Sequence, residues 1–180
     1  KKLEINPKVI IVSMLVMFAS NSIASSIEPR IYNGESTRTQ DWPFMVSLVI
    51  KNTTSKFCGG SLIAKSWVLT AGHCVQKITE GDFKILVNAS AAYSNDQELI
   101  AVERIYRHNQ YDQPTRFNND IALIKLATPS KFQPVEVLAE HSDQDDPGRK
   151  TVALGWGVTD YLPALFGITS LDLQQISLPI

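Results

Sequence analysis

The sequence predicts an all-β fold, a sandwich or a barrel, for the part of the chain that follows residue 30. Short runs of β-branched and aromatic residues recur there, and none is longer than seven residues. Residues that favour turns (Gly, Pro, Asn, Asp and Ser) separate these runs. Sustained helical periodicity is almost absent, which disfavours an alternation of helices with parallel strands.

Eight strands are predicted from these runs, and a polar segment divides them into two groups. The run Trp67–Thr70 is the clearest, because aromatic and β-branched residues fill it and Gly72 then breaks it. The stretch Ser142–Lys150 is the most polar one beyond residue 30 and is predicted to link two units. The predicted strands are Met45–Ile50, Ser61–Ala64, Trp67–Thr70, Phe83–Val87, Leu99–Ile105, Ile121–Lys125, Val152–Leu154 and Gln174–Leu178.

Residues 1–24 are predicted to be a secretory signal peptide. Lys1, Lys2 and Lys8 precede an apolar run at Val9–Ala19, and cleavage is expected after Ala24. The run has about half of the roughly 20 residues that a transmembrane helix needs, so no stable membrane anchor is expected; an uncleaved anchor is the alternative. The protein is therefore expected outside the cell, or in the periplasm if it is bacterial. Because the first residue is Lys rather than Met, the true start is expected to be missing.

Composition and charge narrow the function classes. Of the 180 residues, 44% are hydrophobic and 19% are charged, which fits a globular protein of one or two domains. Beyond residue 30 there are 13 Lys and Arg against 16 Asp and Glu, so the net charge of −3 gives no basic surface for nucleic acid. No glycine-rich phosphate loop or CxxC pair occurs, and no cofactor is expected. The two cysteines, Cys58 and Cys74, follow the export signal, so a single disulfide is the default.

A histidine beside a cysteine at the end of an apolar strand indicates chemistry as well as packing. His73 can act as a general base only if a second group fixes its tautomer and its orientation. Asp120 is the acidic residue best placed to do this, because it lies at the polar mouth of the strand predicted at Ile121–Lys125. The alternative is that Asp120 serves only as a turn residue at the start of a strand.

Six motifs, taken in order, resemble those of the chymotrypsin-like (trypsin-type) serine peptidases, and they span essentially everything after residue 30. The motifs are R-I-Y-N-G at 30–34, W-P-F-M-V-S-L at 42–48, F-C-G-G-S-L-I at 57–63, W-V-L-T-A-G-H-C at 67–74, N-N-D-I-A-L-I-K-L at 118–126 and A-L-G-W-G at 153–157. The resemblance implies an all-β, two-barrel fold. The first antiparallel barrel is expected to be complete at about residues 31–141, and the second, at about residues 150–180, to be truncated.

The resemblance also implies roles for individual residues. His73 matches the general base that takes a proton from a nucleophilic serine and later returns it to the leaving amine. Asp120 matches the carboxylate that holds this imidazole and stabilises its charged form. Trp156, between Gly155 and Gly157, matches a structural position in an early strand of the second barrel.

Cys58 and Cys74 match the family's bridge between the strand before the histidine and the histidine's own loop. The bridge would close a loop of 16 residues, which the chain-entropy estimate values at about 3 kcal/mol. The alternative is a zinc site formed by Cys58, His73, Cys74 and His108. That alternative is disfavoured, because adjacent His and Cys side chains are expected to diverge and no CxxC or HxxxH spacing supports it.

Arg30 and Ile31 match the activation junction of the family, where an activating protease frees the amino group of the isoleucine. Residues 25–30 would then be a short propeptide, and residues 31–180 a peptidase domain that is incomplete at its C-terminal end. Tyr32 and Asn33 depart from the small residues that are more usual at this junction. The alternative is a chance Arg-Ile pair behind a signal peptide.

The nucleophile of the family lies in a G-D-S-G-G motif, and these 180 residues contain none. Ser170 and Ser177 are not expected to replace it, because neither lies in a glycine-rich context. The expected parent protein is a secreted serine endopeptidase, made as a zymogen, that cleaves protein or peptide substrates through an acyl-enzyme; this chain is expected to be an inactive piece of it. The alternative is a truncated, non-catalytic homologue that acts as a binding protein.

Overall fold

The structure is a computed structural model that describes residues 34–89, 96–138, 146–157 and 172–179. The predicted signal peptide (1–24), the propeptide (25–30) and the junction at Arg30 and Ile31 lie outside the described residues. Within the described part, no helix is long and apolar enough to cross a membrane. The elements are strands β1 (Glu35–Thr37), β2 (Met45–Ile50), β3 (Lys56–Ala64), β4 (Trp67–Thr70), β5 (Phe83–Val87), β6 (Glu98–Arg107), β7 (Ala122–Leu126), β8 (Lys150–Gly155) and β9 (Leu173–Pro179), with 3₁₀ helices η1 (Thr39–Asp41) and η2 (Gly72–Val75).

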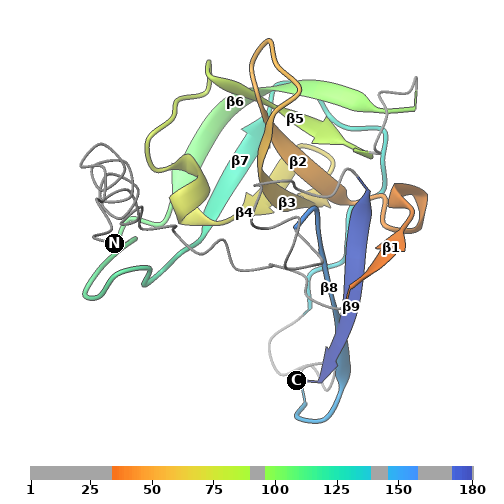
Figure 1. Cartoon of the computed structure of the whole chain (residues 1–180). Coiled ribbons are helices and arrows are strands. Elements are labelled where there is room, and N and C mark those ends of the chain that lie inside the picture. The colour runs from red at the N-terminus through yellow and green to blue at the C-terminus, as the bar shows by residue number, and fades with distance from the viewer. Residues whose placement is uncertain (1–33, 90–95, 139–145, 158–171, 180) are drawn as a thin grey trace, which may run out of the picture.

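Six strands close into an antiparallel barrel in the order β2-β3-β4-β7-β6-β5, with β5 pairing back onto β2 (Figure 1). Closure pairs every strand of the barrel on both sides and leaves no free sheet edge there. The predicted complete first barrel is therefore confirmed. Its rigidity fixes the positions at which the connecting segments leave the strands.

Aliphatic side chains from alternating strand positions fill the barrel. In β7, Ala122, Ile124 and Leu126 are buried, whereas Leu123 and Lys125 between them are only partly buried. The same alternation in the other strands completes one continuous core. The remaining core residues include Val46, Leu48, Leu62, Val68, Phe83, Ile85, Val87, Ile100 and Val102.

A smaller apolar cluster lies on the outer face of the barrel and connects it to the second sheet. Val49, Leu86 and Ala89 are buried there, and Trp156, just after β8, packs against them. The ammonium group of Lys56 lies 4.8 Å from the centre of the Trp156 ring. Trp156 therefore joins the two units by packing, the structural role that the resemblance implied.

The second unit is a three-stranded antiparallel sheet in the order β1-β9-β8. The β8–β9 pair extends away from the barrel, and β1 pairs with its near end through Glu35–Thr37 (Figure 1). Among the described residues, this sheet is the second β unit that the two-barrel prediction requires beside the first barrel. Of the predicted linker, only residues 146–150 are described, and Lys150 already belongs to β8.

Strand boundaries differ from the predictions where glycine or charged residues take part in pairing. β3 begins at Lys56 rather than Ser61, because Gly59 and Gly60 pair with β2 instead of breaking the strand. β6 continues to Arg107 because it stays paired with β7 up to that residue. Hydrophobic patterning gave both strands bounds that were too short, since backbone pairing does not require apolar side chains.

Gly60 is required by the close approach of β3 to β4. A Cβ atom at Gly60 would lie 2.7 Å from the backbone oxygen of Leu69 and 3.0 Å from Cγ1 of Val68. At the neighbouring Gly59, a Cβ atom would meet only the backbone oxygen of Val46, at an ordinary 3.8 Å. The two adjacent glycines therefore differ in how much space they have.

We expect Gly60→Ala to lower the free energy of unfolding by about 1–3 kcal/mol, because the backbone of β4 must move to admit the methyl group. Gly59→Ala is the matched control and should change this free energy by less than about 0.5 kcal/mol. Urea denaturation of the two variants measures the difference. Equal effects would contradict the close approach of β3 and β4.

Candidate active site

The pairing of β4 with β7 brings His73 and Asp120 to the same end of the barrel. Thr70, the last residue of β4, lies opposite Ala122, the first residue of β7. In an antiparallel pair, the chain that leaves one strand passes the chain that enters the other. His73 follows Thr70 by three residues and Asp120 precedes Ala122 by two, so the register of the two strands alone makes them neighbours.

Asp120 bonds His73 through both carboxylate oxygens. Nδ1 of His73 lies 2.7 Å from Oδ2, and the backbone N–H of His73 donates to Oδ1 at 2.8 Å. An ionised carboxylate can only accept, so Nδ1 carries the proton and Nε2 of the neutral ring keeps its lone pair. The His73 side chain is 47% exposed, so a reacting group can reach the ring. The structure thus brings the two predicted residues together.

Gly72, which begins η2, allows this approach. It is buried, and a Cβ atom there would lie 2.7 Å from the ring of Tyr111 and 3.3 Å from Oδ1 of Asp120. Sequence reasoning treated Gly72 only as the residue that ends a strand. Its contact distances show that it also makes room for the His73–Asp120 pair.

The loop before β7 is held by its own hydrogen bonds. Asn119 has a φ angle of 52°, a left-handed conformation that Asn tolerates. Its side-chain amide donates to the backbone carbonyls of Gln110 and Gln113, at 3.1 and 3.2 Å. The backbone N–H of Ile121 donates to the carbonyl of Asn119 at 2.8 Å. These bonds restrain the residues on both sides of Asp120.

Phe117 forms an apolar wall beside the imidazole, and sequence reasoning missed it. Its ring meets the His73 ring edge to face, with centres 6.1 Å apart, and the guanidinium of Arg116 lies 4.7 Å from the centre of the Phe117 ring. Phe117 has a φ angle of 63°, and its N–H donates to Oδ1 of Asp112 at 2.8 Å. A positive φ at a bulky residue is strained, and nothing in residue type reveals it.

Burial raises the pKa of Asp120, and its hydrogen bonds lower it by more. The bonds from the side chain and backbone of His73, the charge of His73 and the N–H of Gly72 together outweigh burial. The pKa of Asp120 therefore lies below its ordinary value. Asp120 is ionised at neutral pH, where its charge can stabilise a protonated imidazole.

The predicted disulfide between Cys58 and Cys74 is confirmed. Cys58 lies in β3 and Cys74 lies on η2, with their Cα atoms 6.1 Å apart. Because Cys74 directly follows His73, the bridge ties the residue that carries the imidazole to the barrel wall. The base is therefore restrained by the disulfide on one side and by Asp120 on the other.

The structure corrects one reason given against the zinc alternative. Nε2 of His73 lies 3.5 Å from Sγ of Cys74, so these adjacent side chains converge within η2 instead of diverging. Together with Sγ of Cys58 they form a group of ligand atoms within 4.8 Å of one another, and His108 does not belong to it. In the oxidised protein both sulfurs belong to the disulfide, so the four-residue site does not form.

Ser177 does not lie beside His73. Ser177 lies at the exposed end of β9, opposite Val152 in the second sheet. Ser170 lies outside the described residues. Among the hydrogen bonds of the described residues, none joins a serine hydroxyl to Nε2 of His73.

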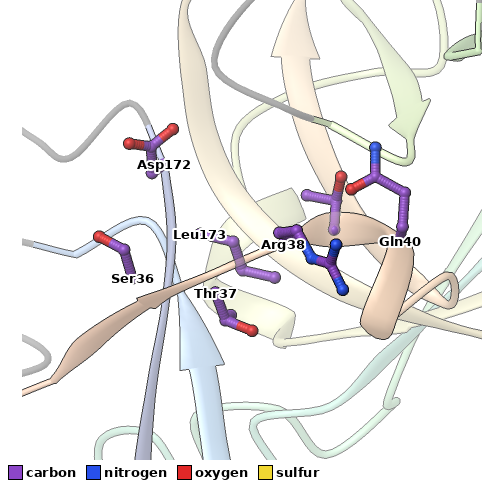
Figure 2. Close-up of a pocket in the computed structure, with 7 residues that line it drawn as sticks. Ser36, Thr37, Arg38, Gln40, Asp172 and Leu173 are labelled. Carbon is purple, nitrogen blue, oxygen red and sulfur yellow. The ribbon is translucent and has the colours of Figure 1, made fainter.

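A cavity of about 310 Å³ lies between β1, η1 and the start of β9, and neither His73 nor Asp120 lines it (Figure 2). Arg38 in its wall is already paired with Asp41, at 3.1 Å. The described residues that line the cavity include no histidine or cysteine, so they offer neither an imidazole base nor a thiol. They are Ser36, Thr37, Arg38, Thr39, Gln40, Asp172 and Leu173.

Asp120 should contribute stability that depends on pH. Its pKa is lower in the folded than in the unfolded chain, so the contribution is complete above about pH 4 and is lost as pH falls through the folded pKa. We expect Asp120→Asn to unfold more easily than the wild type at about pH 6 and to approach it near about pH 2. Asp146→Asn, which removes one negative charge from an exposed turn, is the control for the change in net charge. A constant difference for Asp120→Asn in urea titrations would contradict the expectation.

A family model, two known proteins and a solved structure match this chain. The family model "Trypsin" matches residues 31–180. Ovochymase of Halocynthia roretzi is 30% identical over 175 residues, 91% of this chain and 10% of that protein. Trypsin of Sarcophaga bullata is 34% identical over 144 residues, 79% of this chain and 56% of that protein. The structure of the Vibrio cholerae VesB protease matches with a TM-score of 0.70 at 29% identity, over 83% of this chain and 44% of that one.

The chain therefore spans about half of the Sarcophaga trypsin and of VesB, and a tenth of ovochymase. The family match includes the end of β4, which positions His73, and the start of β7, which positions Asp120. The structural match to VesB shows that the backbone of this chain follows a similar path to that of a known protease. Because the family model matches residues 31–180, the chain belongs to the trypsin family of chymotrypsin-like serine peptidases.

Proposed function

We propose that this chain is part of a secreted serine endopeptidase that is made as a zymogen and hydrolyses peptide bonds through an acyl-enzyme. The observation that carries the proposal is the His73–Asp120 pair, in which the carboxylate bonds Nδ1 at 2.7 Å and 47% of the His73 side chain is exposed. A serine hydroxyl is a weak nucleophile until a positioned base removes its proton. We expect the serine to come from a part of the parent protein outside these 180 residues.

In the proposed cycle, His73 moves a proton twice in each half of the reaction. Nε2 takes the proton from the serine hydroxyl as the oxygen attacks the carbonyl carbon of a protein or peptide substrate. The imidazolium then gives this proton to the leaving amine. In the second half, Nε2 takes a proton from the water molecule that attacks the acyl-enzyme ester and returns it to the serine oxygen. Asp120 stays ionised and stabilises the imidazolium in both halves.

Two observations support the secreted zymogen. The Cys58–Cys74 disulfide suits an oxidising compartment outside the cytosol. The family match begins at Ile31, the residue whose amino group would be freed by cleavage after Arg30. A protease that cleaves after arginine is therefore the activating partner that we propose.

The rival proposal is a non-catalytic homologue that binds its partner, and the absence of a G-D-S-G-G motif from these 180 residues favours it. The coding sequence downstream of residue 180 separates the two proposals. A glycine-flanked serine in frame supports the peptidase, and an immediate stop codon supports the binding homologue. The same sequence would also show whether an Asp at the base of the specificity pocket sets a preference for Lys and Arg.

In the parent peptidase, we expect His73→Ala and Asp120→Asn each to lower kcat roughly 10⁴-fold, because one removes the base and the other removes the charge that orients it. His108→Ala is the matched control: this exposed histidine accepts a hydrogen bond from the N–H of Gln110, at 3.2 Å, and its loss should leave kcat unchanged. Steady-state hydrolysis of peptide amides, normalised by active-site titration, measures these effects.

The 180-residue chain by itself is expected to show no turnover of peptide esters that depends on His73. A His73-dependent burst of product from this chain alone would contradict the proposal that the nucleophile lies elsewhere. A parent protein in which His73→Ala retains full activity would contradict the role of the base.

A further inference from the structure

Three atoms that can bind a metal ion converge where the disulfide meets the base. Sγ of Cys58, Sγ of Cys74 and a ring nitrogen of His73 all lie within 4.8 Å of one another. Both cysteines are only partly buried and His73 is exposed, so solutes can reach the group. In the oxidised protein the two sulfurs are bonded to each other, and this bond occupies their ligand capacity.

The spacing of these atoms suits a tetrahedral zinc ion. Bond lengths of about 2.3 Å to sulfur and about 2.0 Å to nitrogen place two ligand atoms about 3.5 Å apart at a tetrahedral angle. Nε2 of His73 and Sγ of Cys74 are already 3.5 Å apart. Once the disulfide is cut, Sγ of Cys58 needs to move to about 3.8 Å from Sγ of Cys74, and rotation of the cysteine side chains would supply this movement.

Asp120 prepares His73 for this role. A histidine that binds zinc usually donates its other ring N–H to a carboxylate, which fixes the ring and raises the basicity of the ligating nitrogen. Asp120 accepts from Nδ1 of His73 at 2.7 Å and so leaves the lone pair of Nε2 available on the side of Cys74. The exposed side of His73 leaves the fourth position to water.

We propose that reduction of the Cys58–Cys74 disulfide turns this group into a zinc site whose ligands are the two thiolates and Nε2 of His73. A dithiol reductant opens the bridge: one thiolate attacks Sγ of Cys58, the S–S bond breaks, and its electron pair stays on Sγ of Cys74. The second thiol of the reductant then displaces Cys58 and completes the reductant's own disulfide. Zn²⁺ replaces the thiol protons, which pass to solvent.

The imidazole takes part in the binding step, because its Nε2 atom, 3.5 Å from Sγ of Cys74, is the third ligand. The bound ion then occupies the lone pair of Nε2, the one that the proposed base needs. The loss of base activity rests on the proposed function, whereas the binding of the ion does not.

The test uses Co²⁺ as a coloured substitute for Zn²⁺ on the untagged chain. The chain is reduced with a dithiol, freed of the reductant without oxygen, and titrated with Co²⁺. We expect one Co²⁺ per chain, with the thiolate charge-transfer band and the intense visible bands of a tetrahedral site, and displacement of Co²⁺ by Zn²⁺. The oxidised chain should show none of these bands.

Matched variants identify the ligands. His73→Ala should weaken Zn²⁺ binding roughly 10-fold or more and change the visible bands, and Asp120→Asn should weaken it roughly 10-fold. Cys58→Ser should abolish the two-thiolate spectrum. His108→Ala, which changes a histidine outside the group, should bind as the wild type does.

Circular dichroism recorded alongside each titration separates binding by the folded chain from capture of the ion by an unfolded one. If the reduced chain is unfolded, refolding by Zn²⁺ that requires His73 supports the proposal. Absence of Co²⁺ binding, or equal affinity in the wild type and His73→Ala, overturns it. If the spectra appear but the parent protein proves to be no peptidase, the metal site stands and the proposed function fails.

Discussion

The register of β4 against β7 is the constraint on which the rest of the site depends. Val68 lies opposite Ile124, and both side chains are fully buried in the barrel. A slip of one strand by one residue would turn its own buried side chains out of the core, so hydrophobic packing fixes the register. His73 and Asp120 lie on the segments that leave and enter these two strands. Their separation is therefore set by apolar residues that take no part in the chemistry.

The strands that sequence reasoning could find are those whose apolar residues dictate their own burial. Trp67–Thr70 and Phe83–Val87 have the bounds that were predicted. Side chains of the first alternate between partly buried and buried positions, and most side chains of the second are buried. Glu35–Thr37 was missed because it contains no apolar residue, and only its pairing with β9 makes it a strand. Local composition does not reveal which segments far apart in the sequence pair with each other, so this strand could be found only in the structure.

The same distinction applies to the site. His73 and Asp120 could be named from residue types and motif resemblance, since few side chains can act as a base and its orienting carboxylate. Gly72 and Phe117 could not. The role of Gly72 depends on the lack of space for a Cβ atom, which would lie 2.7 Å from the Tyr111 ring, and the strain at Phe117 depends on its positive φ angle. The convergence of His73 and Cys74 was predicted wrongly, because a general rule about adjacent side chains ignored the local turn of η2.

The electrostatics of Asp120 explain why the pair lies at the ends of strands instead of inside the barrel. A carboxylate in the core would lose its hydration entirely, and pairing would rarely restore what that costs. Two residues before β7, Asp120 keeps a quarter of its side chain exposed and accepts hydrogen bonds from two N–H groups of His73. Burial raises its pKa, yet these bonds lower it by more. The barrel thus supplies rigidity without burying the charges, and for that reason its chemistry lies on the segments that connect the strands.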